Sequence, residues 1–212
     1  MHEPLFLLPT PARAGFHEVF PRKFSQVFHA LRAMMTILSR QSDKREKMIS
    51  VAGTDIFQQL IDLLDAQQAR YRVMDHEPVG KCEAVSALRG TALEQGAKAL
   101  VCKVKGHGIK QHVLAIIAAD KQADLAALAA GIGGSKASLA SPPEVDSLTG
   151  CVFGAIPPFS FHPSLKLVAD PLLFERVDEI AFNAGRLEKS IVLNTADYLR
   201  IARPELMAFH AA

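Results

Sequence analysis

The feature that most constrains this chain is a stretch rich in glycine and proline at residues 149–163, with the sequence TGCVFGAIPPFSFHP. The short apolar run 151–153 predicts a buried strand, which ends at Gly154 and passes into a turn with three prolines. Proline fixes φ and removes an amide donor, whereas glycine adopts conformations that other residues avoid. The stretch therefore predicts a stiff loop with exposed carbonyl groups, which can hold a ligand by its backbone.

The rest of the chain predicts a mixture of helices and strands from the spacing of its apolar residues and from its caps. Two β-rich runs, 99–104 and 112–117, flank Lys105-Gly106-His107-Gly108, which predicts a hairpin. Hairpins mixed with helices, without regular βαβ alternation, indicate an α+β domain around a mixed sheet. The other predicted strands are 71–74, 165–169, 179–182 and 190–193. The predicted helices are 54–64, 82–88, 120–130, 141–150 and 195–202.

Residues 1–47 differ in pattern from the rest of the chain. Four prolines interrupt the first part, residues 24–38 predict a short amphipathic helix, and 40–47 form a polar run. Met48 then opens a well-patterned segment and is a candidate start of translation. We expect 1–47 to be a poorly ordered extension or a start-site artefact, with a transit peptide as a further alternative, and 48–212 to form the domain.

The charge of the chain is unevenly distributed. The whole chain has a net charge of +2, but residues 48–212 hold 16 Lys and Arg against 18 Asp and Glu, a net charge of −2. Such a body does not bind a polyphosphate strongly by charge alone. A nucleic-acid substrate would have to be gripped locally or delivered by a partner.

The three cysteines, Cys82, Cys102 and Cys151, are far apart and form no C-x-x-C pair, which argues against a structural zinc or a disulfide framework. Cys102 and Cys151 lie in strand-like runs and are predicted to be small buried hydrophobes. His107 and His112 near Cys102 fit no recurrent metal spacing, so no metal is expected. No apolar run approaches the ~20 residues of a membrane span, and a cytoplasmic protein is expected.

No G-x-S-x-G elbow, Walker loop or Rossmann glycine pattern is present, so a serine-hydrolase triad has no support. The run GIGG at 131–134 follows a helix and predicts a helix stop.

Two short motifs carry a resemblance to a known family. The sequence GAIPP at 154–158 resembles the GxxxP loop of the YbaK / prolyl-tRNA synthetase-associated editing domain family. The sequence GAKALV at 96–101 resembles the strand-opening lysine that sits opposite this loop in the family. The resemblance runs from about residue 51 onward, and FHP at 161–163 and FNAGR at 182–186 are similar to the YeaK-like branch. It implies an α+β fold with a mixed, mostly antiparallel, barrel-like β-sheet surrounded by helices.

The resemblance implies that Lys98 and Gly154 are the catalytic positions. In the family the lysine contacts the aminoacyl-tRNA terminus and is needed for deacylation. Lys98 would then neutralise the terminal phosphate or the developing oxyanion of the ester. Its position alone favours a solvated lysine at the end of a strand.

The resemblance also implies that the loop backbone positions the aminoacyl group and a hydrolytic water, whereas the residues alone fit an ordinary proline-rich connection equally well. His162 can bind the substrate amine or a water, or be a loop histidine with no task. His76, beside Asp75, suggests acid/base chemistry or a structural turn. Pro157 stands where many family members have Ser or Thr, which bears on the choice of substrate. The expected substrate-binding residues are Ala155, Ile156, Pro157, Pro158, His162 and His76.

The function that the resemblance implies is a trans-editing deacylase. It would hydrolyse the ester of a mischarged tRNA carrying a small amino acid, with Ser or Thr favoured and Ala or Cys as alternatives. The activated ester needs only a positioned water and the vicinal ribose hydroxyl, so no cofactor is expected, and the volume of the pocket would exclude larger residues. The expected partner is the acceptor end of aminoacyl-tRNA, delivered by a synthetase or an elongation factor, with no DNA and no membrane. The alternative is a non-catalytic binding or regulatory module of the same fold that holds an aminoacyl-tRNA end or a small ligand.

Overall fold

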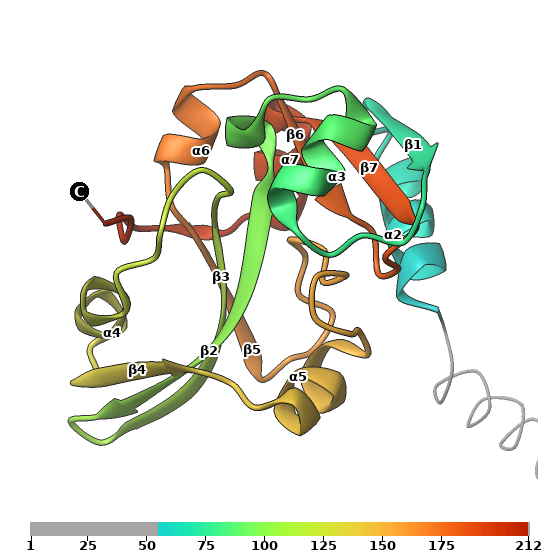
Figure 1. Ribbon diagram of the computed structural model, residues 1–212. Coiled ribbons are helices and arrows are strands. Elements are labelled where there is room, and N and C mark those ends of the chain that lie inside the picture. The colour runs from blue at the N-terminus through green and yellow to red at the C-terminus, as the bar shows by residue number, and fades with distance from the viewer. Residues whose placement is uncertain (1–54, 212) are drawn as a thin grey trace, which may run out of the picture. The chain divides into compact units, whose positions relative to one another are not determined.

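The computed structural model describes residues 55–211, so the expected extension 1–47, its helix and the candidate start at Met48 lie outside the described residues. Helices and strands alternate irregularly along this part of the chain (Figure 1). Its helices are α2 (Ile56–Ala66), α3 (Cys82–Arg89), the short 3-10 helix η1 (Leu93–Gln95), α4 (Leu125–Ile132), α5 (Pro142–Thr149), α6 (Leu172–Glu175) and α7 (Thr195–Ala202).

The strands form two sheets. The smaller sheet has the antiparallel order β1-β7-β6, and the larger has the order β4-β2-β3-β5-β8. In the larger sheet β4, β2 and β3 pair antiparallel, whereas β5 pairs parallel with β3 and β8 pairs parallel with β5. The strands are β1 (Tyr71–Asp75), β2 (Ala97–Gly106), β3 (Ile109–Ala118), β4 (Lys136–Leu139), β5 (Leu165–Ala169), β6 (Glu179–Asn183), β7 (Lys189–Asn194) and β8 (Glu205–Leu206).

The α+β class with mostly antiparallel pairing is confirmed, although the two sheets are not closed into a barrel. They meet at one isolated parallel bridge between Gly96, just before β2, and Ala181 in the middle of β6. We call this contact the sheet junction. It brings the start of β2 against β6, so that residues of both sheets can line one cavity.

The predicted hairpin is confirmed as β2–β3. The two strands pair without interruption from Ala97 opposite Ala118 to Gly106 opposite Ile109. The connecting residues His107 and Gly108 both have positive φ, 51° and 80°, as a tight two-residue hairpin turn requires. Strand β2 therefore extends from the sheet junction at Ala97 to the hairpin turn at Gly106.

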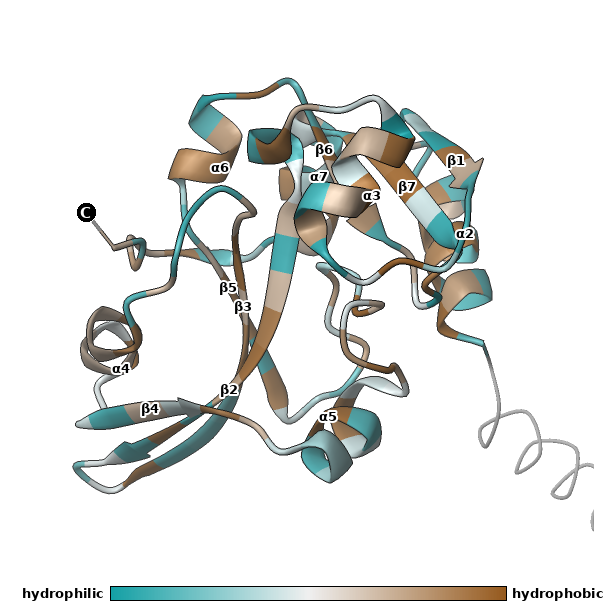
Figure 2. Ribbon diagram, in the orientation of Figure 1, coloured by the Kyte–Doolittle hydropathy of each residue, from teal (hydrophilic) through white to brown (hydrophobic). Residues whose placement is uncertain are grey.

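The larger sheet is covered on both faces. Strand β3 is hydrophobic from Val113 onward (Figure 2), and its residues are buried there. Along β2, Val101 faces the larger core cluster, with α2 and α7, whereas Cys102 and Val104 face a smaller cluster with α4. Cys102 and Cys151 are both buried, as predicted. Within residues 55–211, no helix is both long and apolar enough to cross a bilayer.

Two sequence-based expectations about elements were wrong, and the short elements β4, β8, α6 and η1 were not predicted. The run 151–153 is not a strand, because Val152 and Phe153 are 61% and 55% exposed and turn back through a hydrogen bond from Ala155 N to Val152 O. Val152 and Phe153 are therefore hydrophobic side chains exposed on the surface.

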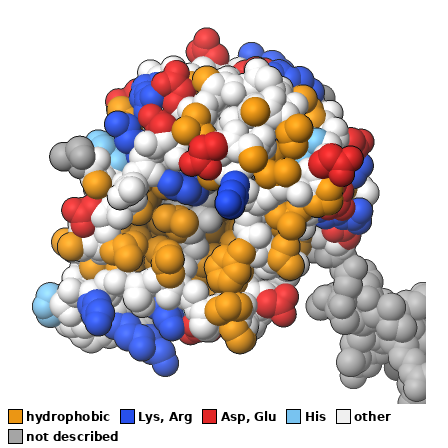
Figure 3. All heavy atoms as spheres, viewed as in Figure 1, with side chains coloured by type: hydrophobic (Ala, Val, Ile, Leu, Met, Phe, Trp, Pro, Cys, Tyr) orange, Lys and Arg blue, Asp and Glu red, His pale blue; other side chains and the backbone are white. Residues whose placement is uncertain are grey.

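Figure 3 shows hydrophobic side chains gathered on one face of the protein.

The helix expected at 120–130 begins later, at Leu125, because the carboxylate of Asp124 accepts the amides of Ala126 and Ala127 and acts as the N-cap. It ends at Gly133, whose φ is 89°, so the expected glycine stop is correct. Strand β4 was missed because it has only four residues, too short a run for its alternation of polar and apolar side chains to stand out.

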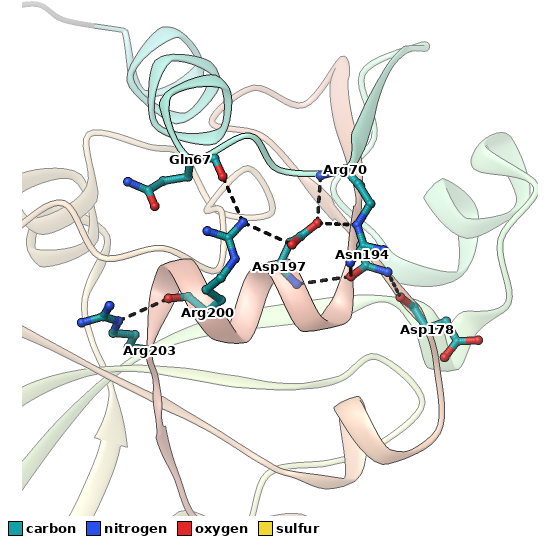
Figure 4. Close-up of polar contacts among 7 residues, drawn as sticks. All are labelled: Gln67, Arg70, Asp178, Asn194, Asp197, Arg200 and Arg203. Carbon is teal, nitrogen blue, oxygen red and sulfur yellow. Dashed lines mark hydrogen bonds and ion pairs between the residues drawn. The ribbon is translucent and has the colours of Figure 1, made fainter.

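A polar network attaches α7 to the segment that leads into β1 (Figure 4). The carboxylate of Asp197 accepts from the Arg70 backbone amide at 2.9 Å, from Arg70 Nε at 2.8 Å and from Arg200 Nη2 at 3.2 Å. Arg200 also donates to the Gln67 carbonyl, and Asn194 caps α7 by accepting from Asp197 N. Hydrogen bonds from Arg70 lower the pKa of Asp197 to about 2.

We predict that Asp197→Asn destabilises the protein in a pH-dependent way. The pKa of the Asp197 carboxyl is ~3.9 in the unfolded chain and about 2 in the folded protein, so the charged form stabilises the fold above pH ~4. This stabilisation is lost as the pH falls towards 2. Urea unfolding of both proteins between pH 7 and pH 2 should show a difference in free energy that shrinks across this window.

The control is Asp146→Asn, because Asp146 is exposed on α5. It should change the unfolding free energy little at any pH. A gap between wild type and Asp197→Asn that stays constant down to pH 2 would contradict the assignment.

Candidate functional site

A cavity of about 240 Å³ lies at the sheet junction. The start of β2 forms one side, β6 and α3 form another, and the loop between α5 and β5 closes the rest. In Figure 1, α3 lies in front of the smaller sheet and this loop lies below it. The lining residues are Gly80, Cys82, Val85, Ser86, Arg89, Gly96, Ala97, Lys98, Ala99, Leu100, Phe153, Gly154, Ile156, Ala181, Phe182 and Asn183.

Lys98 and the loop residues Gly154 and Ile156 were predicted from two widely separated parts of the chain. The structure brings all three to this cavity. Lys98 is the second residue of β2, opposite Ile117 on β3, and is half-buried. Its ammonium donates to the backbone carbonyls of Ala119 and Lys121, just beyond β3. Within residues 55–211 no carboxylate lies within 4.0 Å of it, so its positive charge is not neutralised by an ion pair.

Gly154 closes the cavity through a close backbone approach. Its φ is 84°, in the left-handed region, and a Cβ added there would lie 2.7 Å from the Cα of Gly80. The Gly154 carbonyl accepts a hydrogen bond from Asn183 Nδ2 at 2.7 Å. Glycine is therefore required at 154, because a side chain would be strained at this φ and would collide with the backbone of Gly80.

The expectation of exposed carbonyls in this loop was wrong. The Ala155 carbonyl accepts from Gly185 N at 2.8 Å, and the Pro158 carbonyl accepts from the buried hydroxyl of Tyr198 at 2.9 Å. Ala155, Pro157 and Pro158 are buried, and of the expected substrate-binding residues of this loop only Ile156 lines the cavity. The prolines hold the loop against the core, and the carbonyls of Gly154, Ala155 and Pro158 are used within the protein.

Neither predicted histidine lines the cavity. His162 Nδ1 accepts from the backbone amide of Ser164 at 3.2 Å, in the turn before β5. His76 lies behind the cavity wall, where Nε2 contacts the hydroxyl of Ser190 and Nδ1 contacts the carbonyl of Glu77. The connection of His76 to the cavity therefore runs through Ser190.

Asn183, at the end of β6, was not predicted. Its amide nitrogen donates to the carbonyls of Val79 at 2.8 Å and Gly154 at 2.7 Å. Its oxygen accepts from Arg89 Nη2 at 2.7 Å and from the hydroxyl of Ser190 at 3.1 Å. All four hydrogen bonds that a carboxamide can make are therefore present, and they fix two loops to one strand.

Arg89, at the end of α3, was also missed. It is 8% exposed, its Nε donates to the Ser190 hydroxyl, and its two hydrogen-bond partners, Ser190 and Asn183, are neutral. No Asp or Glu within residues 55–211 forms an ion pair with it. Burial lowers the pKa of Arg89 to about 10, so the side chain remains a cation at neutral pH.

Among residues 55–211, Cys82 is the only residue with a sulfur atom that lines the cavity, and burial favours the protonated form of its thiol. Burial raises its pKa, an effect that outweighs the opposing influence of Lys98. A protonated thiol is a weak nucleophile, so the site does not favour a cysteine-bound intermediate. Within residues 55–211 no group of three or more His, Cys, Asp or Glu side chains could hold a metal ion.

The sequence contains a signal for Arg89, although not for Asn183. In α3 the inward-facing positions are Cys82, Val85, Ser86 and Arg89, which follow the helical spacing i, i+3, i+4, i+7. Leu88, the most hydrophobic residue of the helix end, is instead 48% exposed. Taking Cys82 and Val85 as the inner face would have placed Ser86 and Arg89 beside them.

The model of the family described as "Aminoacyl-tRNA editing domain" matches residues 76–201, and the chain belongs to this family. The chain is 74% identical over 157 residues to the "Multifunctional Ser/Thr-tRNA deacylase ProXp-y" of Escherichia coli (strain K12). That alignment covers 74% of this chain and 94% of the relative.

Two solved structures share the fold. The crystal structure of hypothetical protein APE2540 matches with a TM-score of 0.65 at 20% identity, over 72% of this chain and 99% of that one. The crystal structure of a putative trans-editing enzyme for prolyl tRNA synthetase matches with a TM-score of 0.61 at 17% identity, over 76% and 100%. At these identities the likeness concerns the fold alone.

We predict that Gly154→Ala destabilises the protein more than Gly90→Ala. Gly90, which ends α3, also has a left-handed φ, 66°, but a Cβ there would meet nothing within 4 Å. Gly90→Ala should therefore cost only the conformational penalty of about 1–2 kcal/mol. Gly154→Ala adds the contact with Gly80, and the difference between the two unfolding free energies in urea measures that contact.

Equal losses for the two variants would show that the approach of Gly80 and Gly154 is not tight, and would contradict the geometry given for the loop.

Proposed function

We propose that this protein is a trans-editing deacylase that hydrolyses the ester of mischarged tRNA carrying Ser or Thr. The observation that carries the proposal is the shared cavity of Lys98 and the Gly154 loop in a member of the editing-domain family. The relative named a multifunctional Ser/Thr-tRNA deacylase supports this choice of amino acid.

The cavity has a size suited to the aminoacyl group. At about 240 Å³ it lies below the roughly 300–1,000 Å³ typical of pockets for drug-sized ligands. We propose that it holds the aminoacyl group rather than a whole nucleotide. In this proposal, selection between small and larger amino acids follows the principle of a double sieve.

Catalysis in this proposal depends on position and charge. A water attacks the ester carbonyl carbon, and the carbonyl oxygen becomes an oxyanion. When the oxyanion collapses, the bond between the carbonyl carbon and the ribose oxygen breaks, and the ribose oxygen leaves as a hydroxyl with a proton from the water. The ammonium of Lys98 stabilises the oxyanion or neutralises the terminal phosphate, and the loop at Gly154 and Ile156 holds the aminoacyl group against it. The substrate's own vicinal hydroxyl assists, so no protein nucleophile takes part.

The remaining predicted residues support this geometry indirectly. Ala155, Pro157 and Pro158 shape the loop from within the core. We propose that His76 acts on the cavity wall through Ser190, while His162 remains a predicted contact for the substrate amine.

We further propose that the protein grips the acceptor end of the tRNA. The net charge of −2 over residues 48–212 supports a local grip and delivery by a synthetase or an elongation factor. We assign the reaction to the cytoplasm, where charged tRNA is used, and the reduced state of Cys82, Cys102 and Cys151 fits that compartment.

We predict that Lys98→Ala abolishes most hydrolysis of Ser-tRNA and Thr-tRNA while the protein stays folded. Removing one charge that stabilises a transition state costs on the order of 100- to 1,000-fold in kcat. Loss in kcat would place the ammonium on the oxyanion, whereas a rise in KM alone would place it on the phosphate. Steady-state deacylation with purified charged tRNA separates the two.

The matched control is Lys103→Ala, because Lys103 lies on the same strand, pairs with Glu144 and does not line the cavity. It should retain activity. Wild-type protein that binds charged tRNA but hydrolyses none of the Ser, Thr, Ala or Cys esters would instead support a non-catalytic binding module.

A further inference from the structure

Phe153 combines two properties, because it lines the cavity and is also 55% exposed to solvent. A residue that does both lies at the mouth of the cavity, where the site opens to solvent. Among residues 55–211, Phe153 belongs to neither hydrophobic core cluster, and its ring forms no aromatic or cation–π pair. The mouth therefore presents an aromatic side chain that the described part of the fold does not use.

The backbone of Phe153 is held in place on both sides. Before it, the Val152 carbonyl accepts from Ala155 N at 3.1 Å and closes a turn. After it, Gly154 lies so close to Gly80 that the space would not admit a Cβ. A phenyl ring on such a fixed turn is pre-organised, so a ligand that binds to it pays little for ordering the protein.

The cavity and its mouth together match the two parts of an aminoacylated 3′ end. In the proposed function the cavity of about 240 Å³ holds the aminoacyl group. The ester joins this group to the ribose of the last nucleotide of the tRNA, an adenosine, so the adenosine must lie at the mouth. Adenine is a flat aromatic ring system, and proteins commonly hold unpaired RNA bases by stacking them on aromatic side chains.

We propose that Phe153 binds the adenine of the 3′-terminal nucleotide by stacking, while the cavity holds the amino acid. This inference rests on the proposed function. The contact is made to a part of the substrate that does not react, so it contributes affinity without selecting between seryl and threonyl groups. Selection of the amino acid and binding of the tRNA end are thus assigned to different residues of one site.

The first test measures kcat and KM for Ser-tRNA in Phe153→Ala and in Phe161→Ala. Phe161 is a matched control because it lies on the same loop and is 37% exposed but does not line the cavity. Stacking of a base on an aromatic ring is worth about 5- to 150-fold in affinity. Phe153→Ala should therefore raise KM by about that factor and change kcat little, whereas Phe161→Ala should leave both unchanged.

Two further variants separate stacking from a general hydrophobic contact. Phe153→Tyr keeps a flat aromatic ring and should keep KM near the wild-type value. Phe153→Leu keeps apolar bulk without a flat face and should raise KM as Phe153→Ala does. Because Phe153 is largely exposed, all three variants should unfold at the same urea concentration as wild type, and a loss of stability that accompanies the rise in KM would contradict the stacking role.

The second test removes the base from the ligand. A stable amide analogue, 3′-deoxy-3′-(seryl)aminoadenosine, is compared with the same amide on a methyl riboside that has no base, both as competitive inhibitors of Ser-tRNA hydrolysis. Wild type should bind the adenosine analogue about 5- to 150-fold more tightly than the base-free one. Phe153→Ala should bind the two equally.

The outcomes that overturn the inference are distinguishable from failure of the proposed function. If wild type hydrolyses Ser-tRNA and Thr-tRNA but is inhibited equally by the two analogues, or by neither, the proposed function stands and the role of Phe153 is wrong. The role is also wrong if Phe153→Ala weakens binding of both analogues by the same factor, because Phe153 then contacts the amino acid. If wild type hydrolyses neither charged tRNA, both proposals are wrong.

Discussion

The site depends on the hydrogen bonds of one carboxamide. Asn183 holds the carbonyls of Val79 and Gly154 on one side and receives Arg89 and Ser190 on the other. These partners come from the segment before α3, the loop after α5, α3 itself and β7. A single side chain therefore fixes three walls of the cavity to the end of β6. Because the surroundings are buried, each bond is stronger than it would be in water and each missing partner would cost more.

Much of the fold could be predicted because local chemistry and tertiary structure agree. Strands β2 and β3 carry apolar residues on both faces, and their turn contains the glycines that positive φ requires. Helix α5, predicted at 141–150, begins with a capping box in which Glu144 accepts from Ser141 N, and Gly150 caps its end. Lys98 and the Gly154 loop were found from a family resemblance rather than from pattern, since neither motif alone distinguishes a site from a surface.

What could not be predicted depends on contacts between distant segments. Asn183 looks like a polar residue at a strand end, and its meaning appears only when β6 lies beside two loops. The spacing of α3 places Arg89 on its inner face, but the local sequence does not show that this cation is buried without an acid among residues 55–211, because its position at the helix end suggests a solvated cation that complements the helix dipole. The apolar run 151–153 suggests a strand, but it meets no neighbouring strand of the described chain to pair with. In each case the structure of the residue depends on segments elsewhere in the chain that lie beside it, or that do not, and the local sequence does not specify these.

Because the cavity lies at the sheet junction, its shape depends on how the two sheets approach each other. One side belongs to the larger sheet and the other to the smaller, and Gly96 joins them through its bridge to Ala181. On its other side, a Cβ at Gly96 would lie only 2.7 Å from that of Ala119, which follows β3 in the larger sheet. Ala119 does not line the cavity, so a larger residue there would press on Gly96 and shift the start of β2 relative to β6 without altering any side chain that lines the cavity. The range of substrates can therefore change through residues that pack against the cavity lining without lining the cavity themselves.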